Sequence, residues 1–132
     1  MIRRDFLSIT TAAALAAGNL ANGAMAQTSQ TTLAGRRVVY QVADYRIQME
    51  FLSEDEIRWT YLAAPEGEAG KTATESVDRV DLRPELVLIS WTEADNTHVV
   101  DVFDFDNQRL HAAFITPDGQ RFMSTAEFVR ED

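Results

Sequence analysis

The sequence predicts an all-β fold, a small antiparallel up-and-down barrel of eight strands. After residue 35, β-branched and aromatic residues alternate with polar ones at a period of two, which is the pattern of half-buried strands. Short segments rich in Gly, Pro, Asp or Asn separate these stretches, and none of them carries the periodicity of an amphipathic helix. Short strands joined by tight turns favour a barrel over a sandwich, because closure removes exposed strand edges.

The predicted strands cover residues 36–42, 45–52, 56–63, 72–82, 85–92, 98–105, 109–116 and 121–129. The second and third alternate most cleanly, whereas residues 72–82 are more polar, as expected near an edge. Pro117 and Gly119 suit a tight hairpin turn before the last strand, since Pro fixes one torsion and Gly accepts a positive one. An eight-stranded barrel has an interior that side chains or one small ligand can fill.

The N-terminal segment has the three parts of an export signal. Arg3 and Arg4 precede a mildly apolar stretch rich in Ala and Thr, which ends in the small-x-small sequence Ala24-Met25-Ala26. The arginine pair followed by Phe6-Leu7 resembles a twin-arginine signal, whose arginines are read by a receptor of the export machinery. We therefore predict a protein carried by the twin-arginine pathway to a periplasmic or secreted location.

Three segments follow from this interpretation. Residues 1–26 are the cleaved twin-arginine-type signal, residues 27–34 a polar leader, and residues 35–130 the barrel domain. Polar residues and Gly18 interrupt the apolar part of the signal, so a membrane-spanning anchor is not expected and the mature chain is predicted not to insert stably in a membrane.

Composition narrows the classes of function. The chain has no Cys, which excludes disulfides, thiolate metal sites and thiol nucleophiles. Its formal net charge of −9 makes nucleic acid and anionic lipid unsuitable partners. The two histidines, His98 and His111, have no fixed spacing to carboxylates and are interpreted as ordinary strand residues. No metal site and no cofactor is predicted, and the oligomeric state is left open.

The sequence lacks the motifs of three common kinds of site: a calcium-binding loop, a phosphate-binding loop and a nucleophile elbow. Asp104, Asp106 and Asn107 lie between two predicted strands and read as a turn, because the Gly and the terminal Glu of a calcium-binding loop are missing. The sequence also contains no Gly-rich phosphate loop and no nucleophile elbow.

Glu93 is the candidate functional residue. It follows the apolar strand 85–92 and shares a strand face with Trp91 unless a bulge intervenes. If that face is inside the barrel, burial would raise the pKa of the carboxyl group and make it a usable general acid or base near neutral pH. If that face is outside, Glu93 is a solvated turn residue.

The segment Ser90-Trp91-Thr92-Glu93 resembles a Ser-Trp-Thr-Glu segment of the phenolic acid decarboxylases, which are small lipocalin-like barrels. The wider pattern is similar to the MoaF-like family of the same calycin group, through Gly35 to Tyr40, Trp59, Ser90 to Glu93 and Val102 to Phe105. This resemblance extends over roughly residues 35 to 120 and implies a lipocalin-like barrel.

The decarboxylases suggest roles for two residues. Their Glu donates a proton to the substrate and tyrosines of their first strand hold it, so the resemblance implies that Glu93 is the acid and Tyr40 a contact. The sequence departs from them where Val38 and Val42 flank Tyr40, since the decarboxylases carry a Tyr-x-Tyr pair there.

The favoured function is binding of a small, apolar or aromatic molecule in the barrel. The residues expected to line its site are Tyr40, Trp59, Tyr61, Trp91 and Glu93. A second hypothesis is a cofactor-free lyase or isomerase that uses Glu93 as general acid or base. A third is a protein-interaction module that is exported with a partner.

Overall fold

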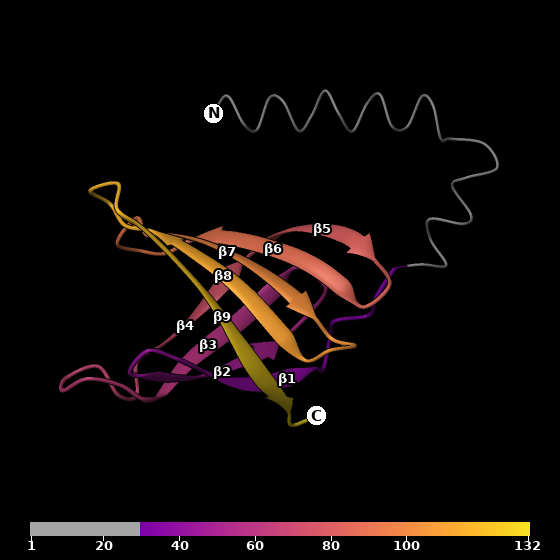
Figure 1. Ribbon diagram of the computed structural model, residues 1–132, viewed down its shortest axis with the longest axis horizontal. Helices are drawn as coiled ribbons and strands as arrows, with labels where there is room; N and C mark the ends of the chain where they lie inside the picture. Colours follow the sequence, from indigo (N-terminus) through magenta and orange to yellow (C-terminus); the bar gives the residue numbers. More distant parts are fainter. Residues whose placement is uncertain (1–29) are drawn as a thin grey trace. The chain divides into compact units, whose positions relative to one another are not determined.

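The structure is a computed structural model that describes residues 30–132, so the predicted signal and the first three residues of the predicted leader lie outside the described residues (Figure 1). The described part contains nine strands: β1 (Arg37–Val42), β2 (Tyr45–Phe51), β3 (Glu56–Ala63), β4 (Thr72–Ser76), β5 (Asp78–Arg83), β6 (Leu86–Thr92), β7 (His98–Asp104), β8 (Arg109–Ile115) and β9 (Arg121–Arg130). Among residues 30–132 no helix is long and apolar enough to cross a membrane.

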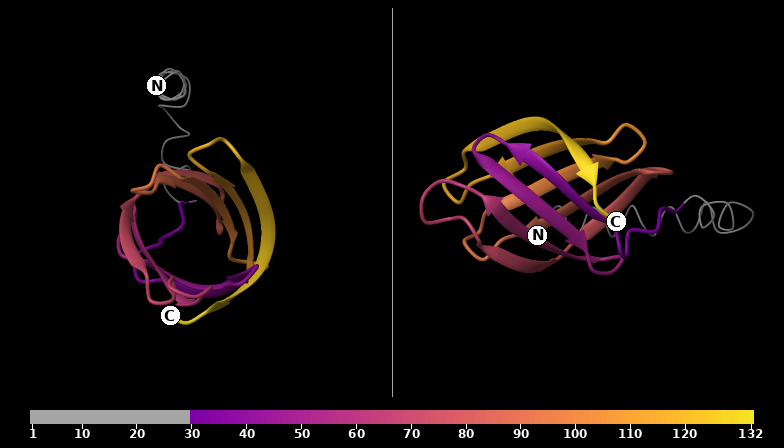
Figure 2. Two further views of the ribbon diagram at one scale, coloured as in Figure 1. Left: turned by 90° about the vertical axis from the view of Figure 1, so that its left-hand side faces the viewer. Right: turned by 90° about the horizontal axis from the view of Figure 1, so that it is seen from below.

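The strands form one antiparallel sheet in the order β4-β3-β2-β1-β9-β8-β7-β6-β5. Seen along its axis, the sheet curls into a nearly closed ring (Figure 2). The predicted all-β barrel is therefore confirmed. The two strands at the sheet's ends, β4 and β5, follow each other in the chain, so the barrel closes where the chain itself passes from one edge to the other.

The structure has nine strands where the sequence predicts eight, because the predicted strand 72–82 divides at Val77. Its first part, β4, pairs with β3, and its second part, β5, pairs with β6. Val77 is buried between the two parts. One predicted strand therefore closes the barrel by pairing with a different neighbour along each half of its length.

The turns alternate between the two ends of the barrel, because successive strands are antiparallel. One end, called here the Glu93 end, carries residues 43–44, 64–71, 93–97 and 116–120. The other, called the Leu33 end, carries residues 52–55, 84–85 and 105–108, together with the segment before β1. Gly119 has a φ of 91°, as the predicted hairpin turn requires.

The Leu33 end is held together by Arg79. Its guanidinium pairs with Glu54 at 2.7 Å and with Asp81 at 2.6 Å, and it also donates to the carbonyl oxygen of Thr31. Glu54 in turn accepts the backbone N–H of Leu33 at 3.0 Å. These contacts fix the chain before β1 across this end, with the side chain of Leu33 fully buried.

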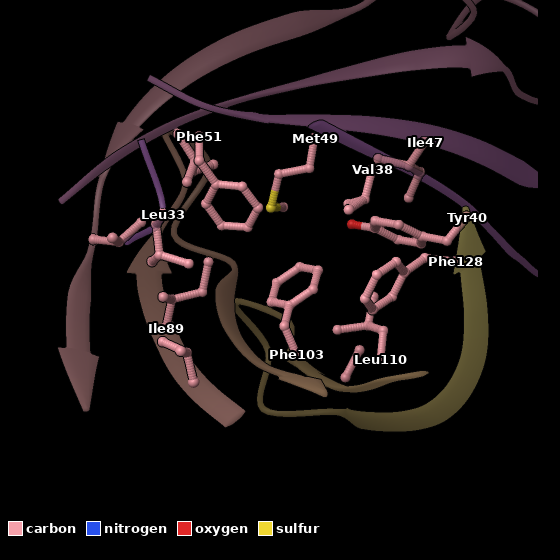
Figure 3. Packing of buried hydrophobic residues seen from close by; sticks show 14 of the residues in the cluster. Leu33, Val38, Tyr40, Ile47, Met49, Phe51, Ile89, Phe103, Leu110 and Phe128 are labelled. Carbon is pink, nitrogen blue, oxygen red and sulfur yellow. The ribbon is translucent and has the colours of Figure 1, made fainter. Parts of the chain in front are cut away.

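The interior next to the Leu33 end is packed with apolar side chains (Figure 3). Phe103 contacts Phe51, Phe105 and Phe128 at ring-centroid distances of 5.4 to 5.9 Å. Tyr40 packs edge-on against Phe103 at 6.4 Å. Strands such as β2 and β6 supply these residues at a period of two, which explains why the alternation in the sequence predicts the core.

Candidate functional site

The face of β6 that carries Trp91 points into the barrel. Val87, Ile89 and Trp91 are buried, and the residues between them are partly exposed. Glu93 continues this inward face beyond the end of β6 and is partly buried. The indole Nε1 of Trp91 donates a hydrogen bond to Oε2 of Glu93 at 3.4 Å. Of the two positions considered for Glu93, the structure therefore shows the inward one.

A cleft of about 380 Å³ lies beside Glu93. It is bounded by the end of β3, the loop and strand that follow, and the turn after β6. Its lining residues are Trp59, Tyr61, Glu68, Lys71, Ala73, Thr74, Glu75, Glu93, Ala94 and Asp95. In the described sheet, β4 and β6 lie close to each other but are not hydrogen-bonded as neighbouring strands. The cleft opens between them, where the barrel is not closed.

Aromatic rings form one wall of this cleft. Tyr61 lies against Trp59 and Tyr45, with ring centroids 4.8 and 4.9 Å apart. The indole Nε1 of Trp59 donates to Oε2 of Glu75 at 3.0 Å, and the hydroxyl of Tyr45 donates to Oε2 of Glu68 at 2.8 Å. These hydrogen bonds hold the rings in place and keep two carboxylates at the edge of the cleft.

Asp101 lies deeper in the barrel, on the inward face of β7 between the buried residues Val99 and Phe103. Its exposure is 2%, and its Oδ1 atom has no hydrogen-bond partner among the described residues. It pairs across the sheet with Ala112, which pairs in turn with Ser124. The hydroxyl oxygen of Ser124 is also buried and unpartnered, so polar atoms lie on both sides of a small alanine in an otherwise apolar wall.

Burial controls the protonation of these groups. Desolvation, together with the charges of Glu75 and Asp95, raises the pKa of Glu93 to about 7, against the opposing hydrogen bond from Trp91. Burial and the charge of Glu93 raise the pKa of Asp101 to about 8. Two carboxyl groups in one apolar interior therefore both exchange protons near neutral pH.

The tyrosines of the site stay protonated. Burial, followed by the charges of Asp101, Tyr61 and Glu93, raises the pKa of Tyr40 well above its ordinary value. Burial and the charge of Glu93 raise the pKa of Tyr61 to about 12. Both hydroxyls are therefore available as hydrogen-bond donors, and that of Tyr40 lies within the interior (Figure 3).

The five residues predicted for the site occupy two levels. Trp59, Tyr61 and Glu93 line the cleft. Trp91 and Tyr40 do not line the cleft and are buried, each 6% exposed. Trp91 is joined to the cleft by its hydrogen bond to Glu93.

The histidines lie outside this site. His98 and His111 hydrogen-bond to threonines on neighbouring strands, Thr92 and Thr125, which agrees with their interpretation as ordinary strand residues. In the part of the chain that the structure describes, no three His, Asp or Glu side chains are grouped as metal ligands would be. Asn107 donates to the carboxylate of Asp104 from its backbone and its side chain, which confirms the predicted turn.

The family of the chain follows from comparison with known proteins. A family model described as MoaF-like matches residues 34–128. The chain belongs to the MoaF-like family. The resemblance seen in the sequence is thus confirmed, and Trp59, Trp91, Glu93 and Asp101 all lie within the matched region.

The fold of this MoaF-like chain recurs among solved structures. A crystal structure from Burkholderia vietnamiensis, provisionally described as a beta-lactamase, is similar with a TM-score of 0.68 and 17% sequence identity. The match covers 75% of this chain and 95% of the other. At this identity the likeness shows the fold alone. The comparison with curated proteins finds no match.

Sequence reasoning missed Asp101 as a member of the site. Residues 98–105 read HVVDVFDF, with apolar side chains on both faces, so the alternation does not show which face is inside. The available signal was the period of two, which places Asp101 with Val99 and Phe103. An acidic residue between two apolar residues on one strand face is compatible with two arrangements. The face is exposed to solvent, or the face is buried and the acidic residue has a function there.

Proposed function

We propose that this MoaF-like barrel is a binding protein for a small, partly aromatic molecule held at the Glu93 end. The observation that carries the proposal is the pair of desolvated carboxyl groups, Glu93 and Asp101, next to an aromatic wall. Burial of such groups without ionic partners lowers folding stability. Interiors that serve only for packing contain few of them, whereas binding sites combine an apolar lining with a few convergent polar groups.

The two ends of the barrel differ in a way that supports this proposal. The Leu33 end is packed with phenylalanines and closed by the ion pairs of Arg79. The Glu93 end instead carries the cleft, with its partly exposed Trp59 and Tyr61. A ligand would enter at the Glu93 end, as in small barrels that hold one molecule.

The test compares native and denaturing mass spectra of protein purified from its own host. A bound molecule gives a surplus mass under native conditions that is lost on denaturation. The same comparison is made for Glu93→Gln and for Glu66→Gln, an exposed position in the loop beside the cleft that does not line it. We expect the surplus to decrease in the first variant only. Equal occupancy in both variants would contradict a site at Glu93.

A second candidate function is supported by the titration of Glu93. A carboxyl group with a pKa near 7 is suited to donate and accept a proton at neutral pH, as a cofactor-free lyase or isomerase requires. This hypothesis predicts that Glu93→Gln keeps ligand binding and loses turnover. A variant that keeps full turnover of a substrate found by mass spectrometry would remove it.

Export through the twin-arginine pathway, with Arg3 and Arg4 as its recognition residues, remains part of the proposal. It rests on the sequence of residues 1–26, and the same denaturing mass spectra test it. Loss of the first 26 residues in periplasmic protein is expected. A full-length chain retained in the cytoplasm would contradict the pathway. Co-purification of a second chain in stoichiometric amount would instead favour the interaction module.

A further inference from the structure

The charge of the Glu93 cleft indicates what kind of ligand it suits. Four of its lining residues are acidic, namely Glu68, Glu75, Glu93 and Asp95, and Lys71 is the one basic residue among them. Two arginines of the Leu33 end, Arg36 and Arg79, are already paired with Glu85, Glu54 and Asp81 and do not line the cleft. An anionic ligand at Glu93 would therefore meet carboxylates on several sides.

Asp101 provides an independent observation within the barrel. Its side chain is 2% exposed, its Oδ1 has no partner among the described residues, and it points into the interior from β7. A buried carboxyl oxygen without a donor is costly. Glu93 is near enough for its charge to affect the pKa of Asp101, so an acidic group in the interior adds to the negative potential of the cleft.

We propose that this site binds an organic cation. The aromatic or apolar part of the ligand packs against Trp59 and Tyr61, its ammonium group is directed toward Glu93, and Asp101 acts on it through its charge from within the barrel. The inference rests on the proposed function, since it names the class of ligand for that site.

Two physical effects favour a cation over a neutral or anionic molecule. Indole and phenol faces attract cations through the negative charge above their rings, and this attraction increases when the site is desolvated. The carboxyl groups supply the opposite charge, and a cation beside Glu93 also offsets the repulsion between Glu93 and the other acidic groups. Phenolic acids, the substrates that the resemblance to decarboxylases suggests, lack this complementarity because their carboxylate is negative.

The proposal links binding to the release of protons. The charged and titratable groups that line the cleft with Glu93 are Tyr61 on β3, Glu68 and Lys71 in the loop, Glu75 on β4 and Asp95 in the turn after β6. The charge of Glu93 also affects the pKa values of Tyr40 and Asp101 deeper in the barrel. The two tyrosines stay neutral, while Glu93 and Asp101 hold protons near pH 7. A bound cation favours their ionised forms, so the protein gives up protons on binding and affinity increases as the pH rises.

The experiment is a calorimetric titration of the full mature chain with three probes of similar size. The first is benzyltrimethylammonium, whose charge does not depend on pH; the second is neutral benzyl alcohol; the third is phenylacetate. We expect the cation to bind at least about tenfold more tightly than the alcohol, as a desolvated cation–π contact with a nearby carboxylate implies. Between about pH 6 and pH 9 its affinity should rise by about tenfold or more, with release of protons to the buffer.

Two variants and one control complete the test. Glu93→Gln and Asp101→Asn should each weaken binding of the cation by about tenfold and reduce proton release, while leaving binding of benzyl alcohol unchanged. Glu66→Gln removes one carboxylate beside the cleft and should leave all three affinities unchanged. Circular dichroism shows whether each variant is folded. If one of the two carboxyl variants does not fold, the other still tests the inference.

The outcomes separate this inference from the proposed function. Binding of phenylacetate or benzyl alcohol at least as tight as that of the cation would overturn the organic-cation inference and leave the binding protein standing. Affinity of the cation that does not depend on pH would also overturn it. If none of the probes binds and the purified protein carries no surplus mass, both proposals fail.

Discussion

The substitution Asp101→Asn is expected to stabilise the unliganded protein at neutral pH. The ordinary pKa of this carboxyl is 3.8, and burial with the nearby charge of Glu93 raises it to about 8. Between these values the folded protein holds a proton that the unfolded chain does not, so stability decreases as the pH rises. The penalty is absent below the unfolded value and complete above about pH 8.

The magnitude follows from the same shift. At pH 7 the carboxyl must take up a proton when the chain folds, which costs about 4 kcal/mol, since each pH unit above 3.8 adds about 1.4 kcal/mol. Asn keeps the shape and carries no charge, but its unpaired amide costs about 1–3 kcal/mol. The net gain for Asp101→Asn is therefore about 1–3 kcal/mol at pH 7, and it becomes a loss of about 1–3 kcal/mol near pH 4, where only the cost of the amide is left.

Urea denaturation of both proteins at pH 4, 7 and 8.5 measures this difference. Asp78→Asn, at an exposed position on β5, is the control and should change the unfolding free energy by less than about 0.5 kcal/mol at each pH. A gain that grows with pH supports the burial of an unpartnered carboxyl group. A loss of stability at pH 8.5, or a difference that does not depend on pH, would refute the reasoning.

Three further predictions concern the site and the two ends of the barrel. Glu93→Gln should remove a transition near pH 7 from the pH titration of the indole N–H signals in NMR spectra, because the pKa of that carboxyl is about 7; persistence of the transition would assign it to another group. Arg79→Met should lower the unfolding free energy by about 3 kcal/mol and increase hydrogen exchange before β1, since Glu54 and Asp81 both lose their ion-pair partner. Arg109→Met, at an exposed 3.8 Å ion pair, should cost less than about 1 kcal/mol. Phe103→Ala should cost about 3–5 kcal/mol in urea denaturation by opening a cavity, and Phe122→Ala, at a half-exposed ring, much less; equal costs would contradict the described core.

The sequence predicts the barrel well because strand alternation is a local signal. Tyr45, Ile47, Met49 and Phe51 recur at a period of two, and in the structure the last three are buried on one face. Turn residues mark the ends of most strands. Local patterns cannot show that residues 72–82 divide at Val77, because that division depends on which strands lie on either side.

Features that depend on distant pairing were also beyond prediction. Leu33 lies in the predicted polar leader, yet it is fully buried because Glu54 and Arg79 hold this segment across the barrel. Asp101 points inward because of the register in which β7 pairs with β6 and β8, and a local pattern does not reveal that register. In contrast, local signals are enough to single out Glu93, because it follows an apolar strand and shares a strand face with Trp91.

The structure indicates a division of roles along the barrel axis. The Leu33 end contains the tight aromatic packing and the Arg79 ion pairs, which stabilise the fold. The Glu93 end contains carboxyl groups whose burial lowers stability, as is common where a site needs groups that packing alone does not favour. The predicted gain from Asp101→Asn measures the cost of keeping that group.

The most direct test of a ligand site at the Glu93 end uses the two tryptophans of the chain. Both Trp59 and Trp91 belong to the predicted site, so their indole N–H signals report on it. Two-dimensional NMR spectra would be recorded during addition of small aromatic fragments of positive, neutral and negative charge. The account predicts that at least one fragment shifts both indole signals and the backbone signals of residues 93–95. Shifts confined to the outer face of β7 to β9, or to the Leu33 end, would contradict it.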